Sequence, residues 1–135
     1  MLMQKQFTAI LIILLTCFFS CKKAIEQKKQ DLIVQAMTSG RWIIQNYTAG
    51  NTDVTAEFTG YEFQFYNNGT VDGIYNSSAT SGTWAGNASQ LTMSANFPNT
   101  GRPLSRLNGL WKITDNSWTY VNASLDTNRL KLIKK

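Results

Sequence analysis

Alternating apolar and polar side chains recur from Gly40 to the end of the chain, and this period of two constrains the fold more than any other feature. Residues 61–66 read YEFQFY, and residues 91–97 read LTMSANF. Such alternation places one face of a strand on a core and the other face in water. The segment Asn67-Asn68-Gly69 between two such runs carries the Asn-Gly pair of a tight hairpin turn. Residues 40–135 are therefore predicted to be an all-β domain.

The number and spacing of the predicted strands indicate how they are arranged. About eight segments lie near residues 41–48, 60–66, 69–76, 80–85, 89–97, 109–114, 117–122 and 128–133. Short, regular turns favour pairing between neighbours in an up-and-down meander. Closing such a meander into a barrel removes both exposed edges. We therefore predict a small up-and-down antiparallel β-barrel, preceded by a short helix of one or two turns within residues 32–39 that ends at Gly40.

The segment before the barrel has the anatomy of an export signal. Residues 7–19 read FTAILIILLTCFF after Lys5; this run is too short for a spanning helix, which needs ~20 apolar residues, but it suits a signal-peptide core. Phe18-Phe19-Ser20-Cys21 resembles the lipobox of bacterial lipoprotein signals, with Cys17 as a rival site. The resemblance implies cleavage after residue 20 and attachment of acyl chains such as palmitate at Cys21. Without histidine or further cysteines, the two cysteines alone make a poor metal site.

The predicted signal and the predicted barrel divide the chain into three parts. Residues 1–20 are a lipoprotein signal peptide, residues 21–31 a lipid-anchored tether, and residues 32–135 the barrel domain. The protein is then expected in the cell envelope, attached to the membrane by its N-terminal anchor. Lipoproteins that stay in the inner membrane commonly carry aspartate after the cysteine, and Lys22 stands there instead, which favours the outer membrane.

Several motifs occur in the order found in one family. They are SGRWIIQNYT (residues 39–48), FTGYEFQFYNNGTVDG (58–73), SGTWAGNASQLTMS (81–94) and LSRLNGLWKIT (104–114). Together they resemble the lipocalin-like domain of small bacterial lipoproteins, particularly those of the Bacteroidetes, with Gly40-Arg41-Trp42 as the lipocalin Gly-X-Trp. The resemblance implies an eight-stranded barrel whose interior binds small apolar molecules, and a late arginine, Arg129, covering Trp42. The larger superfamily's Thr-Asp-Tyr motif is only hinted at here, because Asn116 follows Thr114-Asp115.

Catalysis is not expected from this sequence. The chain has no histidine, the usual general base near neutral pH, and no nucleophile elbow, phosphate-binding loop or metal-spaced cluster. The carboxylates in or near the predicted hairpins are interpreted as solvated surface groups: Glu57, Glu62, Asp72 and Asp115. We predict a protein that is not an enzyme and needs no cofactor or metal.

Binding of a small apolar or amphipathic ligand is the leading hypothesis for function. Inward-facing residues of the predicted barrel that would line its site are Phe63, Phe65, Met93 and Trp111. Residues 99–108 form the longest break between strands, and Arg102 and Arg106 in this loop would meet a polar headgroup. Two alternatives stay open: the aromatic residues are simply core in a barrel filled by its own side chains, and the loop is a solvated segment or a helical turn that caps the barrel.

The charge distribution bears on partners. The net charge of +5 is concentrated at the two ends of the chain, whereas residues 40–128 hold four basic and six acidic side chains, a balance of 4 − 6 = −2. No basic face with interleaved aromatic residues is visible, so nucleic acid is not an expected partner. Basic ends beside a lipid anchor suit anionic headgroups. If the barrel is filled, the second hypothesis is a lipoprotein that binds an envelope protein partner, inhibits an enzyme or has an accessory structural role.

Overall fold

The computed structural model describes residues 21–135, so the predicted signal peptide and Cys17 lie outside the described residues. A helix covers residues 21–38. It is followed by nine strands and two short 3-10 helices. In chain order these are β1 (Trp42–Ala49), β2 (Thr52–Asp53), η1 (Thr55–Phe58), β3 (Glu62–Phe65), β4 (Thr70–Tyr75), β5 (Ser78–Asn87), β6 (Thr92–Asn96), η2 (Leu104–Leu107), β7 (Gly109–Asn116), β8 (Tyr120–Leu125) and β9 (Asn128–Lys134).

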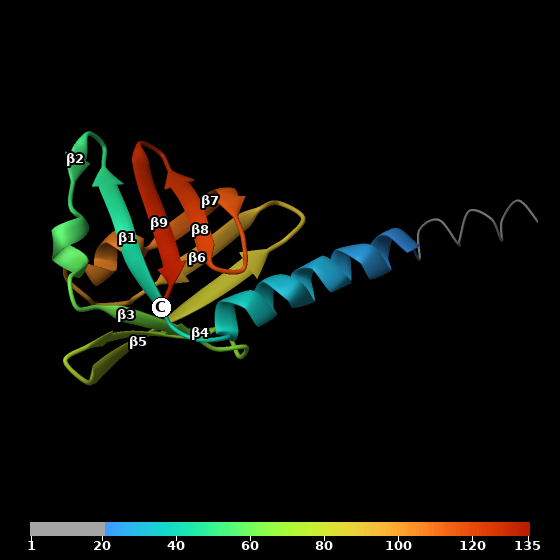
Figure 1. Ribbon diagram of the computed structural model, residues 1–135, viewed down its shortest axis with the longest axis horizontal. Coiled ribbons are helices and arrows are strands. Elements are labelled where there is room, and N and C mark those ends of the chain that lie inside the picture. The colour runs from blue at the N-terminus through green and yellow to red at the C-terminus, as the bar shows by residue number, and fades with distance from the viewer. Residues whose placement is uncertain (1–20) are drawn as a thin grey trace, which may run out of the picture.

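The strands form a closed antiparallel barrel. From β3 to β9 each strand pairs with the next along the chain, and β1 closes the sheet by pairing with β9 over most of its length (Figure 1). The short β2 pairs only with the last residues of β1, which leaves eight strands in the barrel wall. The predicted all-β, up-and-down barrel of about eight strands is confirmed. Gly69, with a φ of +85°, occupies the turn of the Asn-Gly hairpin as expected.

The wall has one weak seam, between β1 and β3. These two strands share a single paired position, Trp42 opposite Phe63. Beyond it β1 turns away to pair with β2, and residues 54–61, including η1, cover the opening. Phe58 of η1 is buried there and stacks on Tyr47 of β1 with ring centroids 5.5 Å apart. An aromatic contact thus replaces strand pairing along the seam.

The core fills the barrel from inside. All the buried side chains among the described residues are apolar or aromatic, and the largest of them include Trp42, Trp111, Tyr47, Phe63 and Phe97. Their strands follow the predicted alternation; in β3, for example, Phe63 and Phe65 are buried and Glu62 and Gln64 are not. A disulfide-free domain of this size depends on such a core for its stability.

The N-terminal helix closes the end of the barrel at which β1 begins and β9 ends, here called the helix end (Figure 1). Met37 is buried, and Ile33 and Val34 pack against the core. The side chain of Gln30 bridges to the strand hairpin: its Nε2 donates to the Gly86 carbonyl at 2.6 Å, and its Oε1 accepts from the Ala88 N–H at 2.9 Å.

The helix is longer than predicted. One or two turns were expected after a tether, yet residues 22–30 are helical as well and project beyond the barrel (Figure 1). The reason is local: this stretch contains no glycine or proline and consists of lysine, glutamine, alanine, glutamate and isoleucine, most of which have high helix propensity. Whether the segment serves as a lipid-anchored tether stays a prediction.

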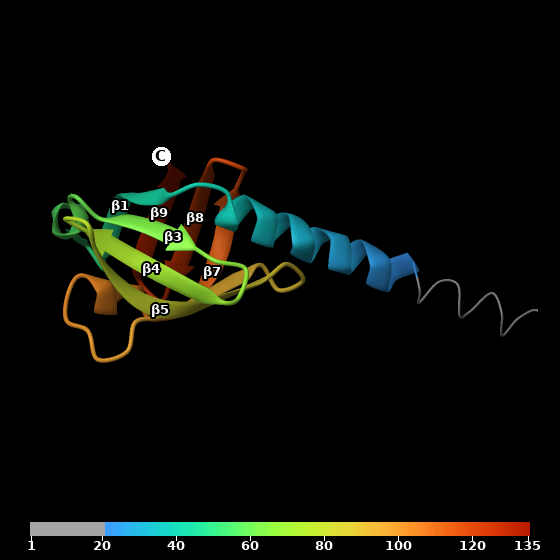
Figure 2. The same ribbon diagram turned by 90° about the horizontal axis from the view of Figure 1, so that it is seen from below.

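The opposite end, here called the η end, is closed by η1 and η2 (Figure 2). Leu104 and Leu107 of η2 are buried in the core. The Asn108 side chain secures the segment by accepting from the Phe97 N–H at 2.6 Å. Residues 99–108 were expected to be either a solvated loop or a helical turn that caps the barrel. The capping helical turn is the one observed.

The cation over the first-strand tryptophan is not the predicted one. Arg129 donates to the carbonyls of Asp126 and Asn128 in its own turn. Lys134 instead holds its ammonium 5.0 Å from the Trp42 ring centroid, because the β1–β9 register places Lys134 opposite Trp42 and Arg129 opposite Thr48. The same ammonium donates to the Ala36 carbonyl at 3.1 Å and thereby caps the C-terminus of the helix.

Candidate functional site

The four predicted apolar site residues do come together inside the barrel. Phe63, Phe65, Met93 and Trp111 are all buried and line one interior cavity, together with Val71, Ala95, Phe97, Leu107, Leu130 and Leu132. The cavity measures only about 20 Å³. A single water needs ~10–15 Å³, and ligand sites usually run to ~300–1,000 Å³. In this conformation the interior is essentially filled by its own side chains.

A second apolar pocket, of about 40 Å³, lies at the helix end between the helix and the barrel rim. Ile33, Ala36 and Met37 of the helix form one wall. Residues from β5 to β8 and their turns form the other: Gly86, Leu91, Met93, Ile113, Asn116, Ser117 and Val121. Asn116 and Ser117 give its lining a polar edge. The prediction of site residues missed the helix wall, although the helical spacing of Ile33, Ala36 and Met37 was visible in the sequence.

Met93 is the one residue that lines both pockets. Its side chain therefore stands between the barrel interior and the helix-end pocket. Methionine is unbranched and changes rotamer more readily than other core residues.

The inward tryptophans hold the barrel closed rather than offering hydrogen bonds to a ligand. Trp42 Nε1 donates to the Met37 carbonyl of the helix at 2.9 Å, and Trp111 Nε1 to the Leu107 carbonyl of η2 at 2.9 Å. Trp84 Nε1 donates to the Tyr66 carbonyl in the β3–β4 turn at 2.8 Å. Each buried indole N–H thus has a backbone partner, as buried indoles require, and those of Trp42 and Trp111 tie a closing segment to the wall.

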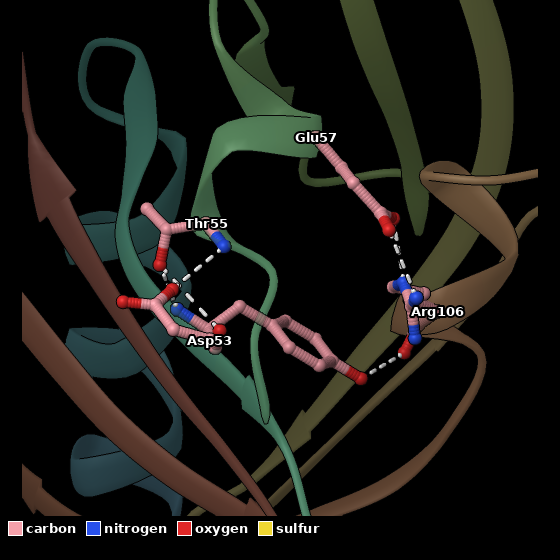
Figure 3. Close-up of polar contacts among 5 residues, drawn as sticks. Asp53, Thr55, Glu57 and Arg106 are labelled. Carbon is pink, nitrogen blue, oxygen red and sulfur yellow. Dashed lines mark hydrogen bonds and ion pairs between the residues drawn. The ribbon is translucent and has the colours of Figure 1, made fainter. Parts of the chain in front are cut away.

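Arg106 lies at the η end, outside the cavity. Its Nε and Nη2 donate to the Glu57 carboxylate at 2.6 and 2.9 Å, joining η2 to η1 (Figure 3). The hydrogen bonds from Arg106 hold the pKa of Glu57 below its ordinary value, and the charge of Arg102 contributes. Arg102 itself is exposed in the loop. The two arginines and the four apolar residues therefore do not converge on one site in this conformation.

Tyr47 completes the closure of the η end. Its hydroxyl donates to the Arg106 carbonyl at 2.7 Å, and its backbone N–H donates to Thr55 Oγ1 at 2.8 Å. Burial raises the pKa of the Tyr47 hydroxyl above its ordinary value. Asp53 accepts from the Thr55 N–H at 2.9 Å (Figure 3). These contacts fix the covering segment of the seam.

The carboxylates that were interpreted as surface groups are engaged at the surface. Glu62 is paired with Arg41, at 2.8 Å, and with Lys135, and these hydrogen bonds lower its pKa. Asp72 accepts from Tyr66 and Ser81, and Asp115 from Tyr120. A general acid near neutral pH needs a raised pKa, so the shifts at Glu57 and Glu62 run in the opposite direction.

Residues 21–135 form neither a metal-ligand cluster nor a membrane-spanning helix. These residues contain no group of three or more histidine, cysteine, aspartate or glutamate side chains that could hold a metal ion. No helix formed by them is long and apolar enough to cross a membrane. Cys21 is exposed at the start of the described helix.

Comparison with solved structures identifies the fold. A protein of the DUF4847 family from Bacteroides vulgatus ATCC 8482 superposes with a TM-score of 0.56 at 14% identity, over 76% of this chain and 97% of that one. A lipocalin-like protein from Bacteroides uniformis ATCC 8492 superposes with a TM-score of 0.51 at 14% identity, over 73% of this chain and 98% of that one. The chain has a lipocalin-like fold. The resemblance read from the sequence is thus confirmed for the fold; no family model and no curated protein matches the chain.

Proposed function

We propose that this lipocalin-like protein is a lipid-anchored envelope protein, not an enzyme, that binds a small apolar or amphipathic molecule. The ligand enters at the helix end and reaches the interior past Met93. The observation that carries this proposal is the shared position of Met93, which lines both the apolar interior and the helix-end pocket. A ligand that displaces the helix would merge the two spaces without breaking the barrel wall.

The helix is the part of the closure that moves most easily. It is joined to the barrel by the buried Met37, by the partly buried Ile33 and Val34, and by a few hydrogen bonds from Gln30, Trp42 and Lys134. The η end, by contrast, is locked by the Arg106–Glu57 pair and by two buried leucines. We therefore expect opening to cost less free energy at the helix end, where the helix contributes one buried side chain, than at the η end, where η1 and η2 contribute three.

The lipid anchor forms part of the same proposal. Cys21 is exposed at the outer end of a helix that projects from the barrel, a placement in which acyl chains would meet no side chain of the domain. We expect metabolic labelling with palmitate to mark the wild-type protein and the Cys17→Ser variant, but not the Cys21→Ser variant. Labelling of Cys21→Ser with loss in Cys17→Ser would move the site to Cys17. Co-fractionation of the labelled protein with the outer membrane is the expected location.

Native mass spectrometry of the protein released from its own envelope tests ligand binding. We expect a reproducible extra mass that organic solvent removes. The Met93→Phe variant, which fills the junction between the two pockets, should lose this mass, whereas Leu110→Phe on the outer face of β7 should keep it. A bare polypeptide mass for the wild type, or equal retention in both variants, contradicts the proposal.

A second candidate function rests on the interior volume of about 20 Å³. It is a filled barrel that acts through its surface as a partner-binding, inhibitory or structural lipoprotein. It is distinguished by the same measurement, because a bare mass for protein taken from its own envelope favours it. Crosslinking of the anchored protein in the envelope would then identify its neighbours.

A further inference from the structure

The N-terminal helix has an exposed apolar stripe beside the face that packs on the barrel. Gln30, Ile33 and Met37 face the barrel. Ile25 and Leu32 are seven residues apart and so lie on one side of the helix, yet they remain 57% and 43% exposed. Nothing in residues 21–135 covers them. Isolated exposed leucines are common on proteins, so the stripe alone does not indicate a binding surface. The side chains around it decide whether it is one.

Lysines flank this stripe, and acids do not. Lys22 and Lys29 lie one turn from Ile25 on its side of the helix, and Lys28 borders the stripe on its other edge. All three lysines are exposed. Asp31 points away, accepting from Gln27 at 3.0 Å on the far side of the helix. The remaining acid of the helix, Glu26, is four residues from Gln30 and lies toward the barrel-facing side.

One turn of the barrel rim adds an exposed tryptophan on the same side of the helix. Trp118 in the β7–β8 turn is 51% exposed and directly follows Ser117, which lines the helix-end pocket together with Ala36, four residues after Leu32. Figure 2 shows the helix passing between this turn and the β5–β6 turn, which is bonded to Gln30 on the other side. Of the four tryptophans, Trp118 is the one that the fold leaves outside the core. Tryptophan at such a position is typical of side chains that sit at a membrane–water interface.

We propose that this basic apolar face, formed by Ile25, Leu32 and Trp118 with Lys22, Lys28 and Lys29, rests on a bilayer that carries anionic headgroups. An apolar centre with lysines on both edges is the pattern of helices that lie in the membrane interface, because the lysine stems cover apolar area while the ammonium groups reach phosphate. The helix then lies along the membrane rather than standing upright on it. This inference does not require acylation of Cys21, although an anchor there would strengthen the contact.

Vesicle binding tests the proposal without the anchor. Residues 21–135 with Cys21→Ser suffice, because they hold every described element and the core lies wholly within residues 37–132. We expect this protein to sediment with phosphatidylcholine vesicles containing phosphatidylglycerol and not with phosphatidylcholine alone. Brominated lipid should quench Trp118, measured as the difference from the Trp118→Phe variant.

Matched variants separate the face from net charge. Lys28→Gln with Lys29→Gln should lower the partition coefficient about thirtyfold, from ~1 kcal/mol per lysine at an anionic surface. Lys112→Gln with Arg129→Gln removes the same charge from the barrel and should change binding by less than about threefold. Likewise Leu32→Gln should weaken binding and Leu110→Gln should not. The proposal is overturned by equal losses of binding in the two charge variants, by Trp118 fluorescence that brominated lipid does not quench, or by no sedimentation with anionic vesicles. In the last case a protein partner would be the remaining occupant of this face.

Discussion

Replacing Trp42 by phenylalanine tests whether one indole holds the N-terminal helix to the barrel. Trp42 is fully buried, its Nε1 donates to the Met37 carbonyl, and the Lys134 ammonium lies over its ring. Phenylalanine cannot donate, so a carbonyl in the last turn of the helix loses its partner at a cost of ~1–3 kcal/mol. The smaller ring and the weaker cation–π contact add ~1 kcal/mol. We expect the free energy of unfolding to fall by ~2–4 kcal/mol.

Urea unfolding followed by circular dichroism measures this change on residues 21–135. The matched control is Trp118→Phe, which alters a half-exposed ring and should stay within ~0.5 kcal/mol of the wild type. Hydrogen exchange should show that the amides near Met37 lose protection before those of β8 do. A loss below ~1 kcal/mol for Trp42→Phe, or the same loss in Trp118→Phe, would refute the reasoning.

Three further predictions follow from single contacts. Gly82→Ala would place a Cβ against the Asn96 carbonyl oxygen and 2.8 Å from the Phe97 ring, so its melting temperature should fall in line with a loss of ~3 kcal/mol or more, whereas Gly101→Ala meets nothing within 4 Å and should be near neutral. Lys134→Gln should cost ~1–2 kcal/mol in urea unfolding through lost capping and cation–π contact, and Arg129→Gln less than ~0.5 kcal/mol. The fold lowers the pKa of Glu57 below its ordinary value of 4.5. Its contribution to stability is therefore present above pH 4.5 and is lost as the pH falls through the lowered pKa. Glu57→Gln should flatten the acid limb of a plot of melting temperature against pH, and an unchanged limb would contradict the assignment.

The barrel was predictable because its signals are local. Alternation in β3 and β6 and the Asn-Gly turn at Gly69 each specify structure within a few residues. The inward set of Phe63, Phe65, Met93 and Trp111 follows from the same alternation, and the structure brings these four together.

The errors concern contacts between distant segments. Whether Arg129 or Lys134 covers Trp42 depends on the β1–β9 register, which exists only once the barrel is closed. Arg106 pairs with Glu57, which is 49 positions away in the sequence. The sequence does not reveal this partner, and Arg106 was therefore predicted to be available for a ligand headgroup. The predicted helix was too short because the outer turns of the observed helix contact no core. Hydrophobic periodicity detects only the part of a helix that has a buried face.

Pairing of β1 with β9 also decides when the fold can be completed. These are the first and last strands, and Trp42 lies opposite Lys134. A chain that is made or exported from its N-terminus cannot close its barrel until the last strand has emerged. Until then β1 has little to pair with, because its contact with β3 is a single position. The topology therefore delays folding to the end of synthesis or export, and contacts of such long sequence separation are slow to form. A protein that must pass through a narrow channel before it folds gains from this delay.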